Sequence, residues 1–271
     1  MRQIVVPLLS FLSFLAAPAG VSAINFEETN ALTERRSEEA DPAMDTEGVD
    51  RGLANVLKNF YLRSFGGSEA WEEISSLRIK GRLLIDDQEL PFISFHKKPN
   101  LVKTRIGISS ENVLIYAYDG RKVWVENEQT GTASAMEPAD ARNFIRTAQT
   151  GSVLLYPKYP GKTIELEGTI EKDGERYYKL ITTLPDGQSL TSYVHTVTYE
   201  ERYFEATDHV NGHRELTVYS DFRVQEGFRF PFKNELFVEG EYHHTVIIDD
   251  LRTNVGMTPW FFVQPAEDVN L

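Results

Sequence analysis

The stretch LRIKGRLLI, residues 77–85, decides the fold, because its apolar side chains alternate with the cations Arg78, Lys80 and Arg82. A period of two sends successive side chains to opposite faces, which predicts a strand with one buried face. The same signal recurs along most of the chain, so we predict a mainly β (α+β) protein. Further strands are predicted at residues 89–97, 101–108, 111–118, 121–127, 163–172, 175–184, 189–198, 201–209, 213–223, 228–239 and 241–251.

Four dipeptides that favour tight turns separate pairs of these strands: Asp119-Gly120, Asp173-Gly174, Asp186-Gly187 and Asn211-Gly212. Each suits a two-residue hairpin turn, in which both central residues have positive φ. Strands joined in this way pair antiparallel, so the sheet is predicted to be a large meander. The first turn would pair Tyr116 with Val123 on one face and Ile115 with Trp124 on the other.

Three helices accompany the sheet. Apolar residues recur at helical spacing over residues 49–63, and Gly66-Gly67 can end that helix. Ser68 can cap a second, short helix that runs to about Ser75. A third helix is predicted within residues 137–150, where it carries Phe144 and Ile145.

A sheet of about a dozen strands leaves long edges and a curved inner face unless it closes or is covered. Two interpretations of the inner face follow from the residues alone. The sheet can wrap around an apolar ligand, or the helix of residues 49–63 can fill the concave face as ordinary core. Both remain open at this point.

The N-terminal region divides into two parts. Residues 1–23 combine Arg2, an apolar run and the small residues Val21-Ser22-Ala23, which is the pattern of a cleaved secretory signal. Residues 24–48 are rich in acids and lack a sustained apolar period, which indicates a flexible leader, with a docking arm for a basic partner as the alternative. Residues 49–271 are predicted to form a single domain, and the mature protein is expected in the periplasm.

Composition excludes several classes of function. The chain of 271 residues has a formal net charge of −13, which disfavours nucleic acid and anionic membrane surfaces as partners. It contains no cysteine, so disulfides, thiolate nucleophiles and cysteine-ligated metals are excluded.

Recognised catalytic and metal-binding patterns are missing as well. GxSxG, HExxH, GxxxxGK[ST] and GxGxxG do not occur. The pair His209 and His213 should lie on opposite strand faces, as should His243 and His244, so neither pair is expected to share a metal. Glu200 and Glu201 are adjacent rather than face-sharing, which argues against a catalytic carboxylate pair. We therefore predict no catalytic residue, no metal and no cofactor.

Aromatic residues give the one positive signal. The stretch FRFPF, residues 228–232, places three phenylalanines on one face. Together with other short pieces it resembles the LolA/LolB-like family of outer-membrane-lipoprotein-sorting carriers, in family order over roughly residues 50–262. The matching pieces are YLRSFGG (61–67), Ile74, LRIKG (77–81), KPN (98–100), YDG (118–120) with Trp124, and GFRFP (227–231).

The resemblance implies an incomplete antiparallel β-barrel of about eleven strands with an α-helical lid, which encloses an apolar cavity for acyl chains in the periplasm. The expected function is a non-enzymatic carrier or binding protein for lipid or lipoprotein acyl chains. The alternative is an RseB-like regulatory or sensor module that binds a membrane or periplasmic protein partner. The expected ligand-binding residues are Phe60 under the lid and Ile79, Leu83, Phe92, Trp124 and Phe230 near the cavity.

Overall fold

The computed structural model describes residues 46–265, except residues 108–112, 139, 142–143, 146–151, 156–160 and 209–211. The predicted signal peptide and almost all of the predicted acidic leader lie outside the described residues. Two helices, α1 (Thr46–Phe65) and α2 (Ser68–Glu73), precede the sheet, and a short 3-10 helix, η3 (Pro259–Phe262), follows it. α1 begins three residues before the predicted start of the domain.

Gly66 and Gly67 separate the two helices, as predicted. Their φ angles are 74° and 125°, values that side chains disfavour. Their amides donate to the carbonyls of Leu62 and Tyr61 and so close the last turn of α1. Ser68 does not cap α2, because the N-cap residue is Gly67 and no side chain caps the helix.

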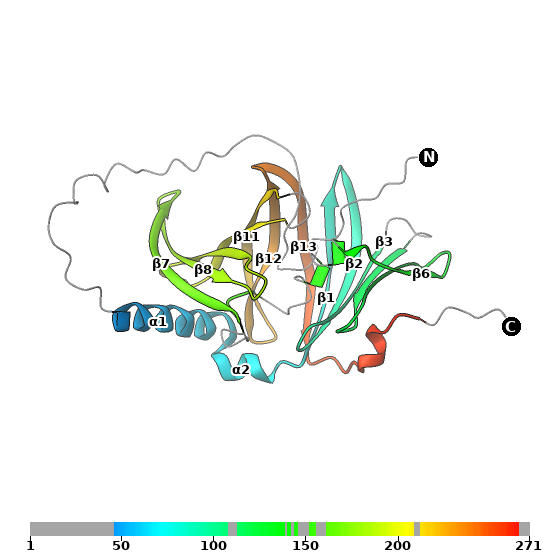
Figure 1. The fold of residues 1–271 in the computed structure, drawn as a ribbon, viewed down its shortest axis with the longest axis horizontal. Coiled ribbons are helices and arrows are strands. Elements are labelled where there is room, and N and C mark those ends of the chain that lie inside the picture. Colours follow the sequence, from blue (N-terminus) through cyan, green and yellow to red (C-terminus); the bar gives the residue numbers. More distant parts are fainter. Residues whose placement is uncertain are drawn as a thin grey trace.

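Thirteen antiparallel strands form one sheet in the order β6-β5-β4-β3-β2-β1-β13-β12-β11-β10-β9-β8-β7. Two meanders, β1 to β6 and β7 to β13, are joined where β1 pairs with β13, near the middle of Figure 1. The strands are β1 (Ser76–Ile85), β2 (Gln88–Lys97), β3 (Leu101–Gly107), β4 (Val113–Tyr118), β5 (Val123–Asn127), β6 (Thr132–Ala135), β7 (Thr163–Lys172), β8 (Glu175–Thr183), β9 (Ser189–His195), β10 (Glu201–Thr207), β11 (Arg214–Gln225), β12 (Phe228–Val238) and β13 (Glu241–Thr253).

The sheet is open, with β6 and β7 as its edges. It has thirteen strands rather than the eleven expected from the resemblance. The strand that sequence patterns did not predict is β6, whose residues TASA show no apolar alternation.

Residues 136–162 connect the two edge strands of the sheet. Within this segment Phe144, Leu154 and Leu155 are buried in the same core cluster as α1. The Phe144 ring lies 6.3 Å from that of Tyr116. Lys162 Nζ donates to the carbonyls of Val153 and Leu155, at 2.5 and 3.0 Å. The described residues 140–141 and 144–145 are helical, where the third helix was predicted.

Described residues of this connection and of α1 pack in one core cluster with the concave face of the sheet. Val56, Phe60, Tyr61 and Phe65 of α1 are all buried in the main core cluster. Figure 1 shows α1 beneath β7 and β8, and α1 contacts β7 and β12. Among the described residues, α1 thus packs as core against part of the concave face.

The predicted turns have mixed outcomes. Asp173-Gly174 is a two-residue turn, with φ angles of 52° and 77° and with Lys172 paired to Glu175. The turn at Asp119 is longer than predicted, because Tyr118 pairs with Val123. Asp119 Oδ1 accepts hydrogen bonds from the amides of Arg121 and Lys122, which stabilises the four-residue loop. The register error is two residues, so side chains of this hairpin that were predicted to share a face still share it.

The other two predicted turns are also longer. Thr183 pairs with Ser189, so five residues lie between β8 and β9. Thr207 pairs with Arg214, so His213 is not opposite Val210 as predicted. His209 and Asn211 lie outside the described residues.

Candidate functional site

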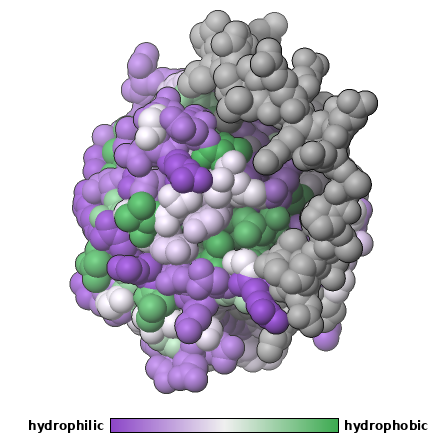
Figure 2. Space-filling model, turned by 90° about the vertical axis from the view of Figure 1, so that its left-hand side faces the viewer, coloured by the Kyte–Doolittle hydropathy of each residue, from purple (hydrophilic) through white to green (hydrophobic). Residues whose placement is uncertain are grey.

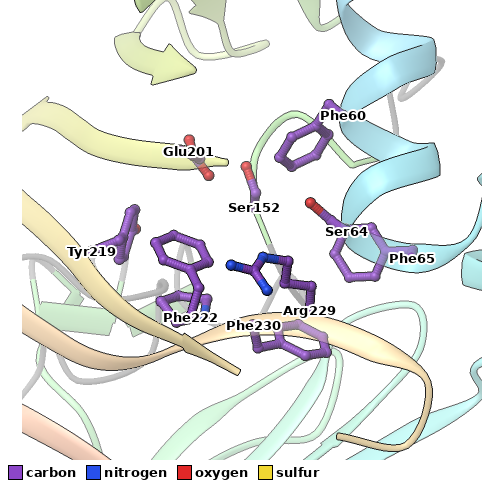
Figure 3. A pocket seen from close by; sticks show the side chains of 10 residues that line it. Phe60, Ser64, Phe65, Ser152, Glu201, Tyr219, Phe222, Arg229 and Phe230 are labelled. Atoms are coloured by element: carbon purple, nitrogen blue, oxygen red, sulfur yellow. The ribbon is translucent and has the colours of Figure 1, made fainter. Parts of the chain in front are cut away.

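A small pocket lies between the C-terminal half of α1 and strands β10 to β12 (Figure 3). Its free volume is about 30 Å³, which holds one or two water-sized groups but not an acyl chain. On the side of the molecule that carries β7 and α1, apolar residues gather near the centre within a frame of hydrophilic residues (Figure 2). The pocket is lined by Phe60, Ser64, Phe65, Ser152, Glu201, Tyr219, Phe222, Arg229, Phe230 and Pro231.

Phe65 is the centre of the aromatic wall. Its ring centroid lies 6.1 Å from that of Phe60 on the same helix and 5.3 Å from that of Phe230 on β12. It also lies 4.9 Å from the Trp71 ring of α2. Such edge-on and tilted aromatic pairs stabilise packing beyond the area they bury. Phe65 therefore ties α1 both to the sheet and to α2.

Two adjacent carboxylates lie at the pocket in different environments. Glu200 is 1% exposed and accepts hydrogen bonds from Arg229 Nε at 2.6 Å and Arg202 Nη2 at 2.5 Å. Thr198 Oγ1 donates to the same carboxylate at 3.0 Å. Burial opposes ionisation of Glu200, but the two arginines and Thr198 outweigh it, and its pKa is lowered.

Glu201 lines the pocket itself and is also buried. Burial raises its pKa from an ordinary 4.5 to about 7, although the hydroxyls of Ser152 and Ser192 favour the ionised form. The neighbouring Tyr219 is fully buried, and its own pKa is well above the usual value because of burial and the charge of Glu201. Glu201 Oε1 has no hydrogen-bond partner among the described residues.

The six sequence-predicted site residues fall into three groups. Phe60 and Phe230 line the pocket. Leu83 and Phe92 are buried in the surrounding core cluster, and Ile79 packs against that cluster, but none of the three reaches the pocket.

Trp124 lies elsewhere and is not brought together with the other five. It belongs to a separate cluster with Ile115 and Ala117 on the other face of the sheet. Its Nε1 donates to the carbonyl of Phe262 at 2.9 Å, so η3 covers it. The placement of Trp124 near the cavity is therefore corrected.

The prediction that His243 and His244 diverge is also wrong. Leu236 pairs with His244 and Phe237 with Tyr242, which makes His243 the extra residue of a β-bulge. A bulge breaks the alternation of faces, and the two Nδ1 atoms lie 2.7 Å apart. Burial lowers the pKa of both imidazoles, that of His244 to about 3. Within the part of the chain that the structure describes, no group of three or more His, Asp or Glu could hold a metal ion.

Sequence reasoning missed Glu201 and Arg229 as site residues. Glu200-Glu201 was considered only as a catalytic pair and rejected on spacing. The feature that matters is that each carboxylate has its own surroundings, which depend on Arg229 from β12 and Ser152 from the connection between β6 and β7.

Comparisons with known proteins identify the fold. The structure matches a LolA superfamily protein from Nitrosomonas europaea with a TM-score of 0.55 and 13% identity, covering 78% of this chain and 97% of that one. It matches an outer membrane lipoprotein-sorting protein domain from Vibrio parahaemolyticus with a TM-score of 0.54 and 8% identity, covering 79% and 97%. A DUF1329 family protein from Desulfovibrio piger matches with a TM-score of 0.55 and 12% identity, covering 79% and 97%.

No protein-family model matches the sequence, and no curated protein matches it either. Among the helices of the described residues, none has the length and apolar character needed to cross a bilayer. The resemblance inferred from the sequence is confirmed at the level of structure: the chain has the fold of LolA superfamily and lipoprotein-sorting proteins.

Proposed function

We propose that this protein is a periplasmic, non-enzymatic carrier or binding protein that shields lipid or lipoprotein acyl chains beneath α1. The observation that carries the proposal is the aromatic surface of α1, which packs into the open concave face of the sheet rather than forming part of it. A dozen methylene groups moved out of water gain nearly 10 kcal/mol at about 0.8 kcal/mol each, before entropic costs. Binding therefore needs no catalytic group.

The small volume of the pocket sets a condition on this function. A space of about 30 Å³ cannot admit an acyl chain while Phe60 and Phe65 are in place. For an acyl chain to enter, α1 must move away from β12, and the acyl chain then makes the contacts with β12 that α1 made before. Gly66 and Gly67 are the natural hinge for this motion, because their backbone angles lie where glycine is least restricted.

The fold of the solved neighbours supports the proposal, since two of them are described as a LolA superfamily protein and a lipoprotein-sorting domain. The signal-peptide pattern of residues 1–23 supports the periplasm as the compartment. A partner-binding module on the same fold remains the alternative outcome of the experiment below.

The test is saturable uptake of a fluorescent fatty acid by the purified protein. Ser64→Asp should abolish or strongly weaken uptake, because Ser64 lies in the wall that an entering chain would contact and an ionised carboxylate there opposes burial of methylene groups. Leu62→Ala is the matched control on the same helix, since Leu62 is 52% exposed and should bind like wild type. Circular dichroism and a thermal melt of each variant separate lost binding from lost folding. Failure of well-folded wild-type protein to take up any acyl probe contradicts the proposal.

A further inference from the structure

Several buried polar atoms on the concave face have no hydrogen-bond partner among the described residues. They are Glu201 Oε1, Thr182 Oγ1, and both Nδ2 and Oδ1 of Asn234. Asn234 is paired in register with Tyr219, which lines the pocket beside Glu201. A buried polar group without a hydrogen bond lowers the stability of the folded protein, so a ligand that supplies the missing partner would be favoured there. Of these atoms, Glu201 Oε1 belongs to a residue that lines the pocket.

The cation in the pocket wall does not balance the charge of Glu201. Arg229 donates to Glu200 at 2.6 Å, and Arg202 donates to the same carboxylate. Glu200 is the partner of both arginines, and neither of them lowers the pKa of Glu201. Among the described residues, no cation pairs with the carboxyl of Glu201, so a cationic head group is the partner that its ionised form would favour.

The size and walls of the pocket narrow the ligand further. The free volume of about 30 Å³ fits a compact head group such as an ammonium. In Figure 3 the rings of Phe60, Phe65, Phe222 and Phe230 lie around the pocket, into which the Arg229 side chain also projects, and Ser152 lies beside Glu201. Aromatic faces also attract a cation that passes them.

We propose that the pocket selects amphiphiles with an ammonium head, which binds the Glu201 carboxylate while the alkyl chain lies against the aromatic wall beneath α1. This inference rests on the proposed function and specifies its ligand class. Glu201 supplies the charge, and Arg229 stays with Glu200.

The test compares three probes of equal chain length by calorimetric titration at pH 8: decylamine, decanoate and decanol. The proteins are wild type, Glu201→Gln and, as a control for the loss of one negative charge, Glu171→Gln on the exposed side of β7. Wild type and Glu171→Gln should bind decylamine about tenfold or more tightly than decanoate, because a hydrogen bond between charged groups is worth at least that factor. Glu201→Gln should reduce the preference to about threefold or less. Melts at the same pH check that each variant is folded.

The outcomes distinguish the two proposals. Equal affinity of wild type for the three probes, or tighter binding of decanoate, overturns the head-group assignment and leaves the carrier function intact. A preference for decylamine that survives in Glu201→Gln overturns it too, because the charge would then lie elsewhere. Absence of binding of all three probes contradicts the proposed function together with this inference.

Discussion

Replacing Glu201 with glutamine should make the protein more stable, by an amount that grows with pH. Burial raises the pKa of Glu201 from 4.5 to about 7. At about 1.4 kcal/mol per pH unit, this shift corresponds to roughly 3 kcal/mol. The folded state holds the proton more tightly than the unfolded chain does. The stability that protonated Glu201 provides is therefore complete below pH 4.5 and is lost as the pH rises through 7.

Glutamine has a similar shape and cannot ionise, so the variant does not lose this stability. The difference between the free energies of unfolding of Glu201→Gln and wild type should increase by roughly 3 kcal/mol between pH 4 and pH 8. Urea denaturation at one-unit intervals of pH measures it directly. Glu171→Gln removes the same charge from an exposed site on β7 and should follow the wild-type curve. Parallel curves for Glu201→Gln and wild type over this range would refute the assignment of Glu201 as a buried, desolvated carboxyl.

Three further predictions concern the core. Phe65→Ala should cost about 3–5 kcal/mol in urea denaturation because Phe65 is 4% exposed, whereas exposed Leu62→Ala should change stability by about 0.5 kcal/mol or less. Gly81→Ala should lower the free energy of unfolding by about 1–3 kcal/mol or more in the same assay, because its Cβ would lie 2.1 Å from a backbone oxygen. Gly256→Ala is the control and should not destabilise the protein, because no atom lies within 4 Å of the added Cβ. Burial lowers the pKa of His96 from 6.5 to about 4, so the stability that neutral His96 provides is present above pH 6.5 and lost as the pH falls through 4. In urea denaturation at a series of pH values, the free energy of unfolding of His96→Gln should lack this loss.

Contradictory results for these three are equally concrete. A small effect of Phe65→Ala would show that α1 is not anchored through that ring. Equal stability of the Gly81 and Gly256 variants would mean that β1 and β13 approach less closely than the structure indicates. A variant at His96 with the same acid dependence as wild type would assign that dependence to other groups.

The parts of the fold that could be predicted from sequence are those set by local patterns. β7 was predicted with its observed bounds, residues 163–172, because its side chains alternate from end to end. The first helix was predicted at residues 49–63 from apolar residues at helical spacing, and it spans Thr46–Phe65. Gly66-Gly67 was predicted to end it, because glycine is favoured where φ is positive, and the second helix, predicted at residues 68–75, spans Ser68–Glu73. The pairing of neighbouring strands followed from turn residues even where the turn length was wrong, since Asp119 still begins a hairpin loop.

The parts that could not be predicted depend on contacts between distant residues. The bulge at His243 arises in the pairing of β12 with β13, and no local pattern marks it. Trp124 lies between two valines, so both faces of β5 are apolar at this point and the sequence does not indicate which of them is the inner one. The contact of Trp124 with η3, which is distant in sequence, shows that its face is the outer one. Glu201 acquires its environment from β9, β11 and the connection between β6 and β7, which meet only in the folded sheet.

Mass spectrometry of lipid extracted from protein purified from its native host without detergent shows directly whether the protein carries acyl chains. We expect reproducible, near-stoichiometric lipid in the wild-type protein and its loss in a folded Ser64→Asp variant, whose carboxylate lies in the wall beneath α1. Wild-type protein that is well folded, carries no lipid and instead co-purifies with a protein partner would contradict the carrier function and favour a partner-binding module.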